Sequence, residues 1–384
     1  MRVAHLVASA GLLVASVGCQ PAATHQASAT ARASSTSSSS AIPTSTPAGV
    51  GQAQAYVVLV QDFYTGANGY QIHLVGADGR LAASTTSRNR SFKKNGLVDL
   101  PVTSTTSTRV YYLDGDSEVR YLTPAGQTGA AYHIAMTGDQ LASFAVAPDD
   151  RRIAVTVIDY ASQPPRMRLF VDELAGGHPV EIFSSSSVYE WPVGWHQGRL
   201  VVAVNPLATV QNAGDWFMQS RGFHIVDVAS ANRLLTICEG LNADTPFPTS
   251  SWGGICMDYP KASSLVSWDG VKRDILVGDQ CPSIGPPSAD GNRVAVVGPN
   301  RVCGGAANDR IRLIDAGGRV TTSVATGNPL GWLDSSHLVF QEDLPPSSPA
   351  GAIAPIKILN LADSSVVLVN TSGFFAGNVP GGLG

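Results

Sequence analysis

The feature that most constrains this fold is a cadence of short apolar runs that recurs about every 45 residues from Tyr56 onward. Each unit opens with a β-branched run, continues with an amphipathic strand that ends in a turn, and closes with a short outer strand. The opening runs are YVVLVQD at 56, RVYYLD at 109, RIAVTVID at 152, RLVVAVN at 199, SSLVSW at 263, RVAVVG at 293 and HLVFQED at 337. Four strands per unit at a fixed period are typical of a β-propeller.

The units predict an all-β chain in which residues 55–384 form a single propeller. Counting gives seven blades. The fifth unit, around Trp252 to Gly278, is short and irregular, so six blades with an insertion is the alternative. One or two β-sandwiches would also show alternating strands, but sandwiches lack this internal period.

The two ends of the predicted domain complement each other. The first unit opens with YVVLVQD and so lacks an innermost strand of its own, while a spare segment, Phe374 to Gly381, follows the last unit. We expect the spare C-terminal strand to complete the first blade. Such a closure removes the strand edges that an open array would expose.

Two turn motifs sharpen this interpretation. They are FAVAPDDRRIAV (Phe144 to Val155) and PPSADGNRVAVV (Pro286 to Val297), with a weaker third copy in GWLDSSHLVF (Gly331 to Phe340). These segments resemble the F-S-P-D-G-x-x-I-A-F unit of the TolB-like, WD40-like propeller repeats. Asp150 stands where that unit has Gly. The resemblance implies protein–protein recognition in the cell envelope, although TolB proteins carry an α/β domain before the propeller and this chain has a polar stretch there.

The N-terminus predicts an export signal and a membrane anchor. Residues 1–18 have one positive charge, Arg2, then an apolar stretch and a small residue, Gly18, as in a secretory signal peptide. Cys19 follows directly, which resembles the lipobox of bacterial lipoproteins, although Ser16 stands where Leu is usual. An ordinary secretory signal with an incidental Cys19 is the alternative.

Residues 19–54 are rich in Ser, Thr, Ala and Pro and contain almost no large apolar side chain, so they predict a disordered stalk. Together, the signal, Cys19 and the stalk predict an exported protein that is lipid-anchored to the bacterial cell membrane on its extracellular or periplasmic side.

Four further cysteines lie within one third of the chain. An even, clustered count in an exported protein predicts two disulfides. We favour the pairs closest in sequence, Cys238 with Cys256 and Cys281 with Cys303. A four-thiolate zinc site is the alternative, but the chain has no closely spaced C-x₂₋₄-C pair of the kind that such sites use.

Composition argues against several functions. Only 14% of residues are charged and the net charge is −4, so the composition does not predict the basic surface that a nucleic-acid partner requires. The chain has no nucleophile elbow, zinc-protease motif or phosphate-binding loop, and its histidines are scattered singly. We therefore predict no catalytic residue, no metal and no cofactor.

The densest group of candidate binding residues is the segment from Tyr189 to His196, which contains Glu190, Trp191 and Trp195. It precedes an inner run, where loops lie near the channel mouth of a propeller. Aromatic rings there could stack on a sugar or peptide, with Glu190 and His196 as polar contacts. Trp252 and Asp258 could add to the same surface. The alternative is that Trp191 and Trp195 pack between blades.

These features predict a binding or scaffold module for an envelope protein, a peptide or a glycan. The alternative is a propeller hydrolase or lyase acting on extracellular polysaccharide, with Glu190, His196 and Asp258 as candidate acid–base groups. A third reading is a spacer without a ligand. An enzyme predicts charged groups that converge at one channel mouth, whereas a binding module predicts a patch without such convergence.

Overall fold

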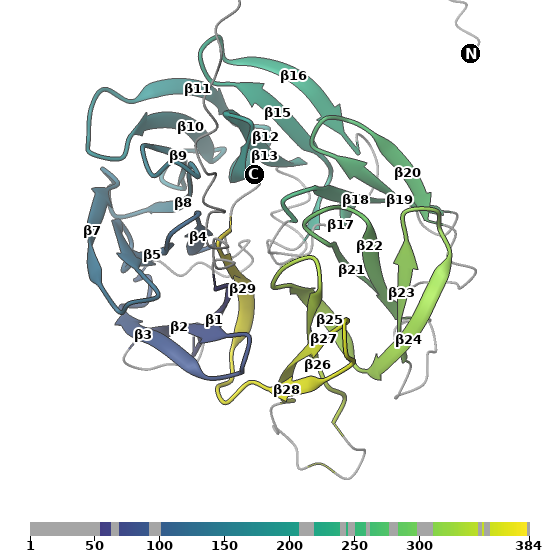
Figure 1. The fold of residues 1–384 in the computed structure, drawn as a ribbon. Helices are drawn as coiled ribbons and strands as arrows, with labels where there is room; N and C mark the ends of the chain where they lie inside the picture. Colours follow the sequence, from purple (N-terminus) through teal and green to yellow (C-terminus); the bar gives the residue numbers. More distant parts are fainter. Residues whose placement is uncertain are drawn as a thin grey trace, which may run out of the picture. The chain divides into compact units, whose positions relative to one another are not determined.

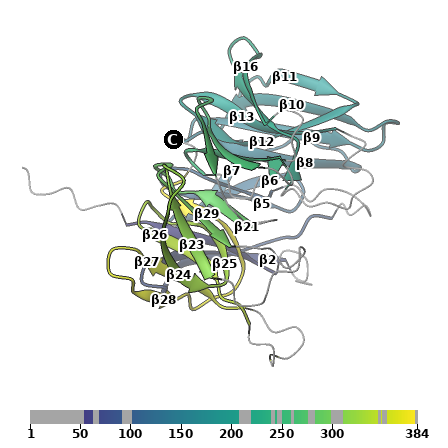
Figure 2. The same ribbon diagram turned by 90° about the vertical axis from the view of Figure 1, so that its right-hand side faces the viewer.

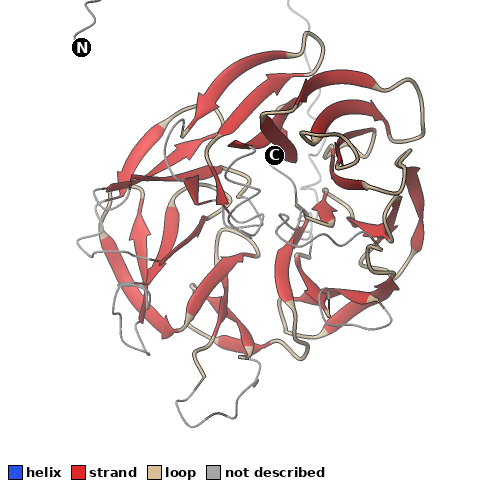
Figure 3. Cartoon of the chain, turned by 180° about the vertical axis from the view of Figure 1, so that it is seen from behind, coloured by secondary structure: helices blue, strands red, loops and turns tan. Residues whose placement is uncertain are grey.

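The computed structural model describes residues 54–62, 69–91, 101–206, 219–238, 243–244, 250–258, 262–275, 283–297, 310–344, 348 and 354–381. All regular secondary structure in these ranges is β-strand (Figure 3). Within the same ranges there is accordingly no helix long and apolar enough to cross a membrane.

Seven sheets form a ring and make a seven-bladed β-propeller (Figure 1). From the axis outward, the first three blades are β29 (Phe374–Val379), β1 (Tyr56–Gln61), β2 (Tyr70–Gly76) and β3 (Leu81–Ser87); β4 (Thr103–Thr105), β5 (Val110–Asp114), β6 (Glu118–Leu122) and β7 (Thr128–His133); and β8 (Gln140–Val146), β9 (Arg152–Asp159), β10 (Arg166–Glu173) and β11 (Val180–Ser185).

The other four blades continue the ring, and Figure 2 shows it from the side. Their strands are β12 (Val188–His196), β13 (Arg199–Pro206), β15 (Phe223–Asp227) and β16 (Asn232–Ile237); β18 (Gly253–Asp258), β19 (Ala262–Ser267) and β20 (Lys272–Ile275); β21 (Ser283–Pro287), β22 (Arg293–Val297), β23 (Arg310–Asp315) and β24 (Val320–Thr326); and β25 (Asn328–Trp332), β26 (His337–Gln341), β27 (Ile356–Asn360) and β28 (Val366–Leu368). A separate two-stranded ribbon pairs β14 (Gln219–Ser220) with β17 (Ala243–Asp244).

The predicted seven-bladed, all-β propeller is confirmed, and the six-bladed alternative is wrong. The fifth blade is the irregular one, because its described part contains three strands where each other blade contains four. Burial follows position in the blade. The middle strand β9 is buried along six consecutive residues, since other blades cover both of its faces, whereas every residue of the outer strand β7 is exposed or half-buried.

The predicted closure by the C-terminal strand is also confirmed. β29 pairs antiparallel with β1, with Tyr56 opposite Val379 and Val60 opposite Phe374. Leu59 of β1 is fully buried, and Phe375 of β29 is only 6% exposed. The inner edge of β1 is therefore covered by the last strand of the chain.

The turn between β8 and β9 explains why the chain departs there from the repeat motif. Asp150 has a φ of 58°, the left-handed region that usually selects glycine but that Asp tolerates better than most residues. Its carboxylate accepts a hydrogen bond from Thr108 at 2.9 Å and lies 3.4 Å from the Arg109 guanidinium. Asp150 therefore ties the third blade to the second, which a glycine would not do.

A disulfide joins Cys238, directly after β16 in the fourth blade, to Cys256 of β18 in the fifth. Their Cα atoms are 5.2 Å apart, and both residues are buried. The bond therefore links the irregular fifth blade to its regular neighbour. Cys281 and Cys303 lie outside the described residues, so their pairing stays a prediction, which non-reducing peptide mapping would test.

Replacing both Cys238 and Cys256 by Ala should lower the free energy of unfolding by about 3 kcal/mol, because the bond closes a loop of 18 residues and restricts the unfolded chain. Urea unfolding of the two proteins without reductant measures the difference. When both proteins are measured in reductant, the wild type should have the midpoint of the double variant. Equal midpoints without reductant would contradict a stabilising role for this bond.

Candidate functional site

The described part of the propeller encloses a cavity of about 230 Å³ on its axis. Residues from all seven blades line it, from the inner strands β4, β8, β12, β21, β25 and β29 and from Ser250–Ser251 ahead of β18. Figure 1 shows these inner strands grouped around the centre of the ring. The cavity therefore depends on the closed ring and belongs to no single repeat.

The walls of the cavity consist of glycines, prolines, hydroxyl-bearing residues and apolar side chains, with one amide. The lining residues are Thr103, Ser104, Thr105, Val146, Val193, Gly194, Ser250, Ser251, Pro286, Pro287, Ala289, Gly331, Trp332, Phe375, Ala376, Gly377, Asn378, Pro380 and Gly381. None of these 19 residues has an ionisable side chain. The described wall thus combines apolar and polar groups and carries no ionisable side chain.

Backbone groups contribute much of its polarity. Each inner strand is the first strand of its sheet and pairs with another strand along one edge only, so its other edge is left without ladder hydrogen bonds. Pro286, Pro287 and Pro380 supply carbonyl oxygens but have no N–H group. Two of these oxygens already accept a protein hydrogen bond, Pro286 from the Trp332 indole and Pro380 from the Asn378 amide, and each keeps a second lone pair.

Several polar side chains of the lining are held by the protein itself. The Ser104 hydroxyl accepts a hydrogen bond from the Val146 N–H at 3.0 Å, and the Ser251 hydroxyl donates to the Ala289 carbonyl at 3.2 Å. The Asn378 Nδ2 donates to the carbonyls of Leu333 at 3.2 Å and Pro380 at 2.6 Å. Both bonds fix the amide so that Nδ2 faces protein carbonyls, which leaves the Asn378 Oδ1 as a preoriented acceptor.

A repeated Pro-x-Gly-Trp motif, at 192–195 and 329–332, shapes two walls of the cavity. In each copy the glycine lines the cavity and the indole N–H crosses to the inner strand of the preceding blade. The Trp195 Nε1 donates to the Ala145 carbonyl at 3.1 Å, and the Trp332 Nε1 donates to the Pro286 carbonyl at 2.9 Å. The sequence prediction did not include this cavity, although the duplicated motif was a signal for it.

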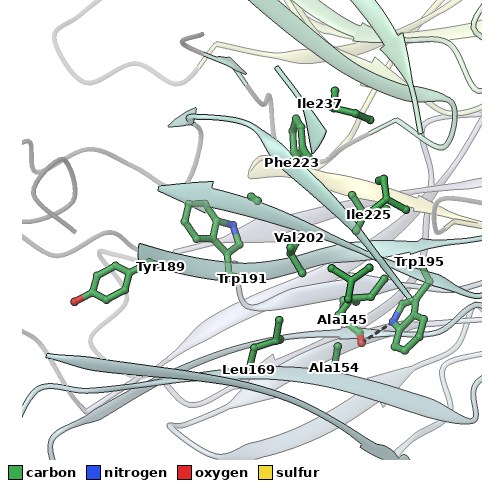
Figure 4. Close-up of a cluster of buried hydrophobic side chains, with 14 of the residues drawn as sticks. Ala145, Ala154, Leu169, Tyr189, Trp191, Trp195, Val202, Phe223, Ile225 and Ile237 are labelled. Carbon is green, nitrogen blue, oxygen red and sulfur yellow. Dashed lines mark hydrogen bonds between the residues drawn. The ribbon is translucent and has the colours of Figure 1, made fainter. Parts of the chain in front are cut away.

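Trp191 and Trp195 lie in a buried core that joins the third, fourth and fifth blades, with Trp195 on the face toward the third blade and Trp191 on the opposite face of its sheet (Figure 4). They are 2% and 1% exposed. The Arg152 guanidinium carbon lies 4.7 Å from the centre of the Trp195 ring, and the indole N–H bonds to Ala145. The two rings are therefore packing residues, the alternative reading of the sequence, and they are not presented to a ligand.

Tyr189, in the same strand, is 2% exposed, and burial raises the pKa of its phenol to about 12. Its hydroxyl is therefore protonated at neutral pH and supplies no charge to this region.

Glu190 is 1% exposed and belongs to an ionic cluster beside the same interface. Its Oε1 lies 2.9 Å from the His224 Nδ1 and 2.6 Å from the Arg233 Nη2. The Arg233 guanidinium also stacks on the Phe183 ring of the third blade, with its carbon 4.8 Å from the ring centre. The carboxylate is consequently used to join strands of the fourth blade and to hold an arginine against the third.

The other candidates also lie at blade junctions. The His196 Nε2 is 3.2 Å from the Asp269 carboxylate, which joins the fourth blade to the fifth. Trp252 has the Arg273 guanidinium 4.9 Å from its ring centre and packs against Gly291 of the sixth blade. Asp258 is the last residue of β18, and its side chain lies outside the described structure.

None of the six predicted binding residues lines the axial cavity, so the described structure does not bring them together as one site. The described ranges also contain no group of three His, Cys, Asp or Glu side chains arranged to hold a metal ion.

Comparison with known proteins gives likenesses of structure only. No protein-family model matches the chain, and no curated protein sequence matches it either. Among solved structures, the chain is similar to TolB from Acinetobacter baumannii (11% identity, 85% of this chain and 65% of that one, TM-score 0.39) and to dipeptidyl peptidase 4 from Porphyromonas gingivalis (11% identity, 82% and 51%, TM-score 0.46).

A third structure is the β-propeller domain of the trilobed protease from Pyrococcus furiosus, with 12% identity, coverage of 73% of this chain and 85% of that one, and a TM-score of 0.44. The chain spans less than two thirds of the TolB structure and about half of the peptidase. At this level of identity the likenesses carry no activity, ligand or partner over to this chain.

Proposed function

We propose that this protein is a ligand-binding module of the bacterial cell envelope and that the axial cavity is its binding site. The observation that carries the proposal is the cavity of about 230 Å³ that all seven blades line, with no ionisable side chain among its described lining residues. Concave sites of mixed apolar and polar character are where proteins bind small groups. Because the ring is closed, the site is preformed and needs no folding step on binding.

The same lining favours binding over hydrolysis or elimination. Acid–base catalysis needs titratable groups within reach of the reacting atoms, and nucleophilic catalysis needs a nucleophile with its base. Glu190 and His196 do not line the cavity, and each is bound to partners at a blade junction. The hydrolase or lyase reading is therefore the less supported of the two functions.

Capture from envelope extract by the full-length protein tests the proposal. Ala289 is exposed at the rim of the cavity, so Ala289→Trp should narrow the entrance without disturbing the core. Ala125→Trp, in the exposed β6–β7 hairpin away from the cavity, is the matched control. We expect the wild type and the control to retain the same envelope component and the Ala289→Trp variant to lose it.

Two outcomes would refute the axial site. One is equal capture by the wild type and both variants. The other is depolymerisation of envelope polysaccharide by the purified wild type, with the activity lost in Glu190→Gln, which would support the enzyme instead.

We also propose that the protein is exported and anchored by lipid at Cys19, with residues 1–18 as signal peptide and 19–54 as stalk. Support comes from the apolar N-terminal segment that ends in Gly18-Cys19. The Cys238–Cys256 disulfide also supports export, because such bonds persist mainly in oxidising compartments.

Cys19→Ala should move the protein from the membrane fraction to the soluble exported fraction, or block its maturation, because the acceptor of the lipid is removed. Fractionation followed by immunoblotting measures this. Ser16→Leu, which brings the segment closer to the usual lipobox, should leave the protein with the membranes. A Cys19→Ala protein that fractionates with membranes as fully as the wild type rules out this anchor.

A further inference from the structure

We infer that the axial cavity takes a neutral sugar ring, presented by a saccharide of the envelope. This inference rests on the proposed function and names the ligand class for the same site. It follows from four properties of the cavity: its size, its charge, the balance of its hydrogen-bonding groups, and its two aromatic side chains.

Size limits the ligand to a small group. The cavity of about 230 Å³ is smaller than the sites of about 300–1,000 Å³ that take drug-sized molecules. A single pyranose ring is a group of suitable size, whereas a folded segment of a partner is too large. We therefore expect one terminal ring inside the cavity and any further rings outside it.

Charge excludes ionised sugars. An ion that enters a confined site loses hydration, and no described residue of the lining carries an ionisable side chain to act as its counter-ion. Asp290 is next to the rim residue Ala289, but its carboxylate accepts hydrogen bonds from Ser288 at 2.6 Å and from Asn292 at 3.0 Å. Although burial opposes the effect, these bonds hold the pKa of Asp290 below its usual value, so this charge is fixed within its own turn.

Hydrogen bonding favours hydroxyl groups over peptide groups. Three of the lining residues are prolines, which lack an N–H group, and the Asn378 Oδ1 is a further acceptor. A sugar hydroxyl can donate to these oxygens and can also accept from Thr103 or Thr105. A peptide brings a carbonyl for each N–H, and the three prolines of the wall offer no N–H to pair with such carbonyls.

Two aromatic side chains, Trp332 and Phe375, complete the lining. Each is 6% exposed, and each is fixed: the Trp332 indole bonds to Pro286, and the Phe375 ring packs against Gly331. The small exposed part of each ring adds apolar surface to the wall, which the C–H groups of a sugar ring can contact. The cavity thus combines an apolar contact with hydrogen-bond acceptors, as a pyranose requires.

Saturation-transfer NMR on the full-length protein tests the inference. The probes are glucose, galactose and mannose, with glucuronate, galacturonate and glucosamine as charged counterparts of the same rings. We expect at least one neutral sugar to give a signal that survives in Ala125→Trp and is lost in Ala289→Trp. Its charged counterpart should bind about tenfold more weakly or not at all.

The inference is overturned if a charged counterpart binds as well as its neutral ring, or if no neutral sugar gives a signal sensitive to Ala289→Trp. Envelope capture separates this failure from a failure of the proposed function. Capture that depends on Ala289 but yields protease-sensitive material would keep the axial binding site and replace the saccharide by a peptide. Capture that is independent of Ala289 would remove both.

Discussion

Deleting residues 374–384 is expected to lower the free energy of unfolding by about 3–6 kcal/mol and to cause aggregation. The deletion removes β29, whose Phe375 and Val379 are 6% and 2% exposed, and burial of each such side chain contributes about 1.5–3 kcal/mol. It also exposes the edge of β1, whose backbone groups would then be free to pair with other chains. Urea unfolding and size-exclusion chromatography measure the two effects.

Deletion of residues 382–384 alone is the control, because it leaves β29 intact, and it should match the wild type in both measurements. A chain shortened at residue 374 that stayed monomeric with an unchanged unfolding midpoint would show that the ring does not depend on this strand.

Gly291→Ala is expected to lower the free energy of unfolding by about 2–4 kcal/mol. Gly291 has a φ of 65°, so a side chain there is strained by about 1 kcal/mol or more. An added Cβ would also lie 2.4 Å from the Trp252 ring, and relieving such overpacking typically costs about 1–3 kcal/mol. Thermal and urea unfolding measure the loss.

Gly126→Ala separates backbone strain from the clash with Trp252. Gly126 also has a positive φ, of 82°, but an added Cβ there would meet no atom within 4 Å. It should show the backbone strain without the clash. If Gly291→Ala were no more destabilised than Gly126→Ala, the Trp252 ring would be free to move aside and would not be clamped between Gly291 and Arg273.

The fold could be predicted because each strand of the repeat is one continuous stretch of sequence. The middle strands are buried on both faces and read as unbroken apolar runs, as in residues 152–159, and each is followed by its own turn residues. The closing strand was predictable for a related reason: Phe374 to Gly381 had no place in the last blade, and the first blade lacked one strand.

The cavity could not be predicted in the same way, since it is made of one to six residues from each of seven blades. Most of them are glycines, prolines and small polar residues that carry no local signal, and backbone edges supply part of the polarity. The aromatic segment at 189–196 was predicted as a binding site because large rings near an inner strand can either stack on a ligand or pack against a neighbouring blade. Only contact with a neighbouring blade decides between the two roles. The Trp195 indole makes such a contact, because its N–H bonds to the Ala145 carbonyl, 50 residues away.

Site-specific photo-cross-linking in intact cells tests most directly whether the axial cavity is the binding site. A benzophenone side chain at position 289 would stand at the rim of the cavity, and the same group at position 125 would stand on the outer hairpin β6–β7. Benzophenones react with C–H bonds of sugars and peptides alike, so the ligand class need not be assumed. The axial site predicts one discrete adduct at 289 that is absent at 125; no adduct at 289, or the same adducts at both positions, would contradict it.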